Sequence, residues 1–156
     1  MSGIFEDEAP VPDARLRVSR EGPRGQELPA RRFARQVLVI FYGIAGVLHL
    51  GWPQPFLSIT PGWVPWPQAV VALTGVAELA GAVGLAQTRS LPLRRAAGWG
   101  LALYALCVWP ANFHHMMLDL GKPNHGARLL YHVPRLLAQP LLIWLAPWAA
   151  GARWRR

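Results

Sequence analysis

Six polar residues lie within or beside long apolar runs, and their side chains could carry out acid–base or ligand-binding chemistry. They are Glu78, His49, Asn112, His114, His132 and Arg135. Imidazole and shielded carboxyl groups exchange protons, and imidazole, amide and guanidinium groups donate hydrogen bonds to ligand oxygens. Which of this chemistry is available depends on where the surrounding segments place the six side chains.

The segments that carry these residues are too poor in charge for a water-soluble domain. Of the 156 residues, 53% are hydrophobic and 15% are charged, whereas about 25% are charged in a typical soluble domain. The first 35 residues hold six of the eight acids, and only eight charged residues lie between positions 36 and 152. We therefore expect an integral membrane protein in the lipid bilayer. The net charge of +8 does not predict nucleic-acid binding, because the basic residues form short clusters between apolar runs.

Four hydrophobic segments predict an all-α, four-helix transmembrane bundle. They cover residues 36–52, 68–87, 96–118 and 129–150. About 20 apolar residues are needed to cross the hydrocarbon core, and lipid leaves exposed backbone groups unsatisfied unless the segment is helical. We expect a disordered cytoplasmic tail over residues 1–34, a four-helix transmembrane domain over 35–150 and a basic cytoplasmic end over 151–156.

Arginine clusters predict that both termini lie in the cytoplasm. One side of a four-helix bundle would carry nine basic residues and the other only Lys122 and Arg128. The nine are Arg31, Arg32, Arg35, Arg89, Arg94, Arg95, Arg153, Arg155 and Arg156. Basic residues collect on the cytoplasmic side of multi-pass proteins, here of the inner (plasma) membrane. The first outer loop, residues 53–67, is uncharged and rich in Pro and Trp, and we expect it to form a rigid cap.

Small residues predict close contacts between the helices. Gly43 and Gly46 share a face of the first helix, and Gly81 and Gly84 belong to small-residue pairs in the second. Such residues let helix backbones approach closely in membranes. Three prolines in the third and fourth segments should kink their helices or open them locally. They are Pro110, Pro134 and Pro140.

Depth along the helices predicts a polar pocket floored by Glu78. At ~1.5 Å per residue, Glu78 lies roughly 15 Å into the second helix, and Arg135 roughly 9 Å below the outer edge of the fourth. His49, Asn112, His114 and His132 lie near outer helix ends, so all four helices place polar groups in the outer half. A pair between Glu78 and Arg135 would make both buried charges tolerable. It would be either a structural ion pair or a proton- or ligand-linked site.

The sequence gives less support for a metal site, a disulfide or a thiolate cluster. His49, His114, His132 and Glu78 could together bind a metal ion, but no two histidines have the i, i+3 or i, i+4 spacing of helical metal sites, so we predict none. His114 and the adjacent His115 point about 100° apart, so at least one should lie outside the pocket. Lys122 and His125 are expected to be solvated. The single cysteine, Cys107, excludes an internal disulfide or a thiolate cluster.

Several motifs together resemble the DoxX-like integral membrane proteins over residues 36–148. They are Gly43-x-x-Gly46-x-x-His49, the Pro61–Pro65 loop, Gly75-x-x-Glu78-x-x-Gly81-x-x-Gly84-Leu85 and Pro110-Ala111-Asn112. The resemblance implies a four-helix membrane fold with both termini inside, and it marks Glu78, His49 and Asn112 as site candidates. The family is named for a subunit associated with thiosulfate:quinone oxidoreductase.

Three functions follow from this combination. The first is a quinone- or redox-associated membrane subunit, in which the pocket holds a quinone, Glu78 exchanges a proton and His49 donates a hydrogen bond to a carbonyl. No covalently bound cofactor or dinucleotide site is predicted, so the redox role requires a membrane quinone or a partner redox subunit. The second is a non-catalytic structural or assembly subunit. For the chain as a whole, the partner beyond the lipid bilayer is expected to be a redox subunit or a second copy in a homo-oligomer. The third is a small proton-coupled transporter. Whether the chain is an enzyme stays open.

Overall fold

The computed structural model describes residues 27–124 and 128–152, which form an all-α fold. Five helices follow one another: α1 (Pro29–Gly51), α2 (Gln54–Leu57), α3 (Pro67–Ala86), α4 (Leu91–Leu120) and α5 (Arg128–Ala149). The prediction of an all-α chain is confirmed, and the four long helices coincide with the four hydrophobic segments. The predicted features of residues 1–26 and 153–156, including the basic C-terminal end, lie outside the described residues.

The boundary predicted at residue 35 is wrong. Helix α1 begins at Pro29, inside the segment predicted to be a disordered tail. Proline suits the first turn of a helix, because its fixed φ is already helical and the first turn needs no N–H donor there. Arg31 and Arg32 therefore lie in the first turns of a helix that extends beyond its apolar part.

Proline and serine also define where the other helices start. Helix α3 starts at Pro67, and the Ser90 side chain accepts a hydrogen bond from the backbone N–H of Leu93 at the start of α4. The three internal prolines predicted to kink their helices lie inside α4 and α5. Both helices continue past them.

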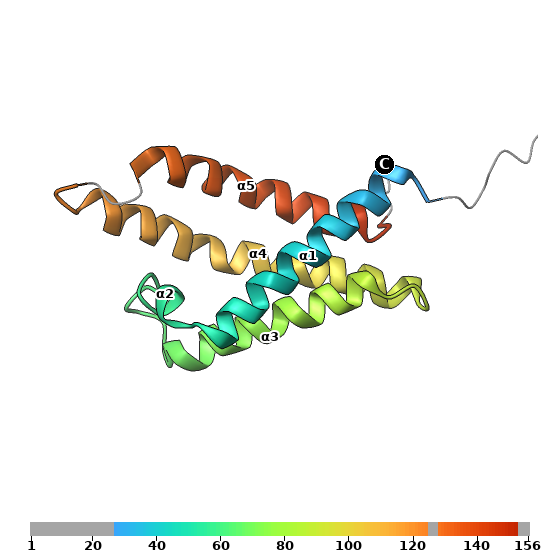
Figure 1. Cartoon of the computed structure of the whole chain (residues 1–156), viewed down its shortest axis with the longest axis horizontal. Coiled ribbons are helices and arrows are strands. Elements are labelled where there is room, and N and C mark those ends of the chain that lie inside the picture. The colour runs from blue at the N-terminus through green and yellow to red at the C-terminus, as the bar shows by residue number, and fades with distance from the viewer. Residues whose placement is uncertain (1–26, 125–127, 153–156) are drawn as a thin grey trace, which may run out of the picture.

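The long helices lie side by side as two antiparallel pairs (Figure 1). Helix α1 packs against α3 and α4 packs against α5, and the two pairs meet mainly through α3 and α4. The short helix α2 and the α4–α5 connection lie at one end of the bundle, which we call the α2 end. The start of α1 and the end of α5 lie at the opposite end, which we call the terminal end.

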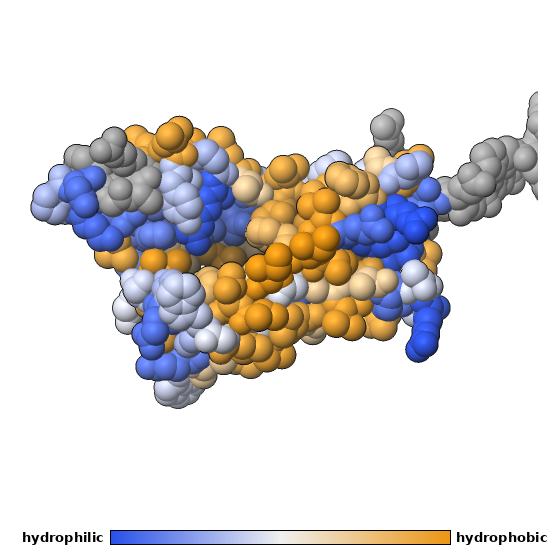
Figure 2. All heavy atoms as spheres, viewed as in Figure 1, coloured by the Kyte–Doolittle hydropathy of each residue, from blue (hydrophilic) through white to orange (hydrophobic). Residues whose placement is uncertain are grey.

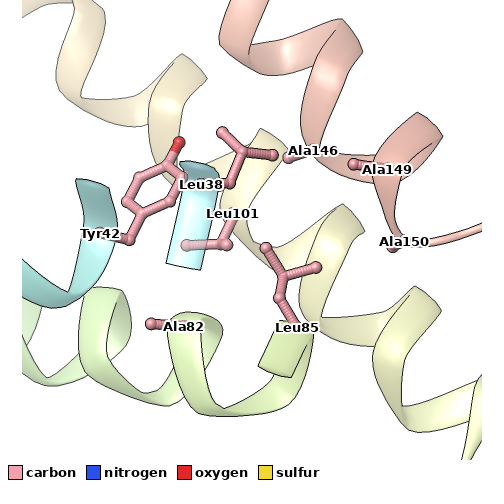
Figure 3. Close-up of a cluster of buried hydrophobic side chains, with 8 residues drawn as sticks. All are labelled: Leu38, Tyr42, Ala82, Leu85, Leu101, Ala146, Ala149 and Ala150. Atoms are coloured by element: carbon pink, nitrogen blue, oxygen red, sulfur yellow. The ribbon is translucent and has the colours of Figure 1, made fainter. Parts of the chain in front are cut away.

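The buried apolar core lies towards the terminal end (Figure 3). Seven of its eight residues come from the four long helices and the eighth, Ala150, directly follows α5; the eight are Leu38, Tyr42, Ala82, Leu85, Leu101, Ala146, Ala149 and Ala150. The alanines of α5 let this helix approach its neighbours closely. In lipid, such packing stabilises a bundle through van der Waals contact, because lipid tails are as apolar as the core.

Three of the four glycines predicted to pack between helices do so. A Cβ added to Gly46 would lie 2.7 Å from Leu79 Cγ of α3, and one added to Gly84 would lie 2.5 Å from Ala97 Cβ of α4. Gly81 is equally confined, against Leu101 of α4. A Cβ on Gly43, by contrast, would meet no atom of the described residues within 4 Å, so the predicted packing role of Gly43 is wrong.

The outer surface of the helices is apolar, as in a multi-pass membrane protein. By length and composition, α1, α3 and the Leu129–Ala149 part of α5 could each cross a membrane. Large apolar side chains face outwards on all four long helices, and Figure 2 shows hydrophobic atoms gathered between two hydrophilic ends. Examples are Ile40, Ile44, Leu73, Val83, Leu103, Leu106, Leu137 and Leu141. A water-soluble protein rarely exposes so much contiguous apolar surface.

Basic side chains at the terminal end have partners. Arg35 is buried and donates hydrogen bonds to the Glu27 carboxylate. This donation, with the positive charge of the same guanidinium, holds the pKa of Glu27 below its usual value despite partial burial. The guanidinium of Arg31 lies 5.3 Å from the centre of the Trp148 ring. The first contact holds the residues before α1 against this helix, and the second joins the first turn of α1 to α5.

Candidate functional site

A cavity of about 480 Å³ lies between the two helix pairs, towards the α2 end. All five helices and the loop after α2 contribute to its walls, which are mainly aliphatic and aromatic. Four of the six predicted site residues line it: His49, Glu78, Asn112 and Arg135. His114 and His132 do not line it, so their predicted place in the pocket is wrong.

The loop predicted to be a rigid cap does cover this cavity. Helix α2 and the residues after it contribute Phe56, Ile59, Thr60, Pro61, Trp63 and Val64 to the walls. The Phe56 ring stacks on the His49 ring, with centroids 3.6 Å apart and planes 23° from parallel. The His114 Nδ1–H donates to the Ile59 carbonyl over 3.1 Å, which fastens the cap to α4.

Three side chains from three helices meet at the polar part of the cavity. Glu78 of α3 is only 3% exposed, and its Oε1 accepts a hydrogen bond of 2.7 Å from the Tyr104 hydroxyl of α4. The Glu78 Oε2 lies 2.8 Å from His49 Nδ1 of α1. The imidazole N–H, however, is directed to the Ala45 carbonyl, 2.9 Å away. His49 therefore neighbours the carboxyl group without donating a well-directed hydrogen bond to it.

Two buried polar atoms beside the cavity consequently have no hydrogen-bond partner in the described part of the chain. One is Glu78 Oε2 and the other is the hydroxyl of Tyr42, which also lines the cavity. A buried polar group without a partner carries a desolvation cost of about 1–3 kcal/mol. A ligand that supplies an acceptor for the tyrosine and a donor or acceptor for the carboxyl group would remove this cost.

The predicted pair between Glu78 and Arg135 is wrong. Arg135 instead donates from Nη1 of its guanidinium to His115 Nδ1 over 2.7 Å, and its guanidinium lies 5.7 Å from the centre of the Tyr131 ring. The guanidinium is therefore held at the edge of the cavity by α4 and by its own helix. The close contacts of Glu78 are with His49 of α1 and Tyr104 of α4.

A second polar cluster lies where α4 ends and α5 begins. Asp119, a residue that sequence reasoning did not single out, is 3% exposed. Its Oδ2 lies 3.0 Å from His132 Nε2 and 3.5 Å from His115 Nε2, and its Oδ1 lies 2.6 Å from Lys122 Nζ. His132 thus belongs to this cluster. Lys122 is half exposed but ion-paired, and His125 lies outside the described residues.

Four residues that line the cavity or belong to the second polar cluster were not identified as site residues from the sequence. For Asp119 a signal existed, because it follows His115 by four positions and so shares its helix face. For Gln139 the signal was a lone amide in an apolar run, and its Nε2 donates to the Ala105 carbonyl over 3.0 Å. No local pattern distinguishes Tyr42 and Tyr104 from tyrosines that face the membrane interface.

Comparison with known proteins gives one match. A family model described as a domain of unknown function (DUF8561) matches residues 38–150, which include nearly all of the bundle. No curated protein and no solved structure matches the chain. The resemblance to DoxX-like proteins is not tested by these comparisons and stays a prediction.

Proposed function

We propose that this chain, which belongs to the DUF8561 family, is an integral membrane protein whose cavity binds a small apolar ring molecule bearing carbonyl or hydroxyl oxygens, of the quinone class. The observation that carries the proposal is that two buried atoms in a mainly apolar cavity, Tyr42 Oη and Glu78 Oε2, have no hydrogen-bond partner among the described residues. The cavity volume of about 480 Å³ falls within the usual range of about 300–1,000 Å³ for small-molecule sites.

The chemistry assigned to these residues is hydrogen bonding and proton exchange. The Tyr42 hydroxyl donates to a quinone carbonyl, and the Glu78 carboxylate accepts from the hydroxyl of the corresponding quinol. When the carboxyl group is protonated, it donates to a carbonyl at the same position. A quinone that becomes a quinol takes up two electrons and two protons. The described residues could handle protons through Glu78, and the electrons would come from a partner redox subunit.

Membrane placement is part of the proposal. Helix α4 packs along both α3 and α5 and has no charged residue between positions 96 and 118, which supports a fourth membrane crossing. The excess of arginine near the terminal end supports a cytoplasmic location of both termini. The cavity accordingly lies in the outer half of the bilayer, within reach of an apolar molecule dissolved in lipid. The DoxX-like resemblance points in the same direction, since the namesake subunit is associated with a quinone-linked enzyme.

A non-catalytic assembly subunit is the second candidate. The observation that favours it is that Glu78, His49 and Tyr104 join α1, α3 and α4. In that case the cluster stabilises the bundle, and the cavity needs no specific ligand.

Titration with quinones tests the proposal. We expect short-chain ubiquinone or menaquinone analogues to bind the protein in lipid nanodiscs saturably, with one molecule per chain. Binding should quench tryptophan fluorescence, because Trp63 lines the cavity. Ala138→Phe should weaken binding at least ten-fold, since Ala138 also lines the cavity and the larger ring would fill it.

Leu137→Phe is the matched control. Its side chain is 66% exposed on the outer face of α5, so the same ring added there should leave the affinity unchanged. Quenching that does not saturate, or an equal effect of both substitutions, would contradict the proposal and favour the assembly subunit.

A further inference from the structure

The polar cluster at the α4–α5 junction takes no part in the proposed quinone site. It contains His115 and Asp119 on one turn of α4 and His132 on the first turns of α5. One donor atom from each of the three residues can be chosen so that all lie within 4.8 Å of one another. Two imidazoles and a carboxylate, brought together from two helices, form a donor set that metal ions recognise.

We propose that this cluster binds one divalent transition-metal ion of the Zn²⁺ class. Ligand atoms about 2.0–2.1 Å from a tetrahedral zinc ion lie about 3.3 Å from one another. The Asp119 Oδ2 lies 3.0 Å from His132 Nε2 and 3.5 Å from His115 Nε2. These two separations lie on either side of the required value, so the carboxylate needs only small adjustments relative to each imidazole.

The burial of Asp119 and His132 favours a defined metal site over a group of charged side chains in contact with solvent. Asp119 is 3% exposed and His132 is 1% exposed, and the His132 Nδ1 has no hydrogen-bond partner within residues 27–124 and 128–152. The side chain of His115 is 20% exposed, which leaves a path for entry from the surface. Three protein ligands would leave a fourth position of the ion for water.

Two neighbouring cations compete with the metal ion. Lys122 Nζ lies 2.6 Å from Asp119 Oδ1 and neutralises part of its charge. Arg135 donates to His115 Nδ1, and a neutral imidazole that accepts at Nδ1 carries its proton on Nε2. To bind the ion through Nε2, His115 must move this proton to Nδ1, and the hydrogen bond from Arg135 must break. The ion therefore displaces Arg135, and no net proton is released from this imidazole.

Titration with Zn²⁺ tests the site. Protein purified in detergent without a histidine tag should bind one Zn²⁺ per chain by isothermal titration calorimetry, and Co²⁺ at the same site should show visible d–d absorption. His132→Ala and Asp119→Asn should each weaken binding at least ten-fold. Arg135→Met should tighten binding several-fold, because it removes both a competing hydrogen bond and a nearby positive charge.

His114→Ala is the matched control, because His114 is adjacent to His115 but donates to Ile59. It should leave the affinity for Zn²⁺ unchanged, and circular dichroism should show the same helix content in every variant. Saturable binding that all variants retain, no saturable binding by the wild-type protein, or weaker binding by Arg135→Met would each overturn the proposal. None of these results depends on whether a quinone binds the cavity.

Discussion

Glu78→Leu is expected to destabilise the bundle and to abolish quinone binding. The substitution leaves the Tyr104 hydroxyl without its acceptor and removes the carboxylate beside His49. A buried hydroxyl left without its hydrogen-bond partner costs about 1–3 kcal/mol. Thermal unfolding in detergent, followed by circular dichroism, should therefore show a marked fall in Tm, and the quinone titration should lose its saturable phase.

Glu78→Gln separates the two effects. The amide oxygen can still accept from Tyr104, so we expect most of the stability to remain. The amide nitrogen can donate to a quinone carbonyl, but it cannot accept from a quinol hydroxyl. The affinity for quinone should consequently change little, while the affinity for quinol should fall at least ten-fold.

Tyr42→Phe provides the complementary control. Because the Tyr42 hydroxyl has no partner in the described part of the chain, its removal should leave Tm unchanged or raise it slightly. The affinity for quinone should nevertheless fall about ten-fold, as for a lost hydrogen bond of about 1.4 kcal/mol. If Tyr42→Phe and Glu78→Gln left the affinities for both quinone and quinol unchanged, the assigned ligand contacts would be wrong.

Gly81→Ala is expected to force α3 and α4 apart. The added Cβ would lie 2.6 Å from Leu101 Cγ, and Leu101 is itself only 2% exposed in the core. Overpacking of this kind costs about 1–3 kcal/mol, and Leu101→Ala alone costs about 2–5 kcal/mol through the cavity it leaves. In the double variant the new methyl group occupies part of that cavity. We therefore expect the double variant to lose less stability than the sum of the two single losses.

Gly43→Ala is the reference for this measurement, since an added Cβ there meets no described atom within 4 Å. It should be neutral or slightly stabilising, because alanine favours helix over glycine by about 1 kcal/mol. Thermal unfolding of the four variants in the same detergent gives the comparison. Additive losses in the double variant, or a loss at Gly43→Ala as large as at Gly81→Ala, would show that the α3–α4 contact is not as described.

The helices were predictable from the sequence because the apolar runs that lipid requires are long and distinct. The rotation of each helix about its axis could not be predicted in the same way. Gly43 and Gly46 are three positions apart, yet an added Cβ would meet α3 at Gly46 and no described atom within 4 Å at Gly43. Membrane helices are apolar on every side, so their sequences contain little information about which face is inward.

Side-chain partners were harder to predict for a related reason. The depth argument placed Glu78 and Arg135 near each other along the membrane normal, but it gave no lateral position. Arg135 instead contacts His115, and Glu78 lies beside His49 and Tyr104. Predicting the pocket from polar groups near the outer helix ends identified four of its residues and wrongly included His114 and His132, which belong to other contacts at the same end.

The most direct test of this account is the side of the membrane on which each connection lies. In a Cys107→Ala background, single cysteines would replace Ser58, Thr88 and Pro123, all of which are exposed. Intact cells would then be treated with a membrane-impermeant maleimide. Four crossings with the cavity in the outer half predict labelling at positions 58 and 123, and at position 88 only after permeabilisation. Labelling of positions 88 and 123 from the same side would contradict the account, because α4 would then not cross the bilayer.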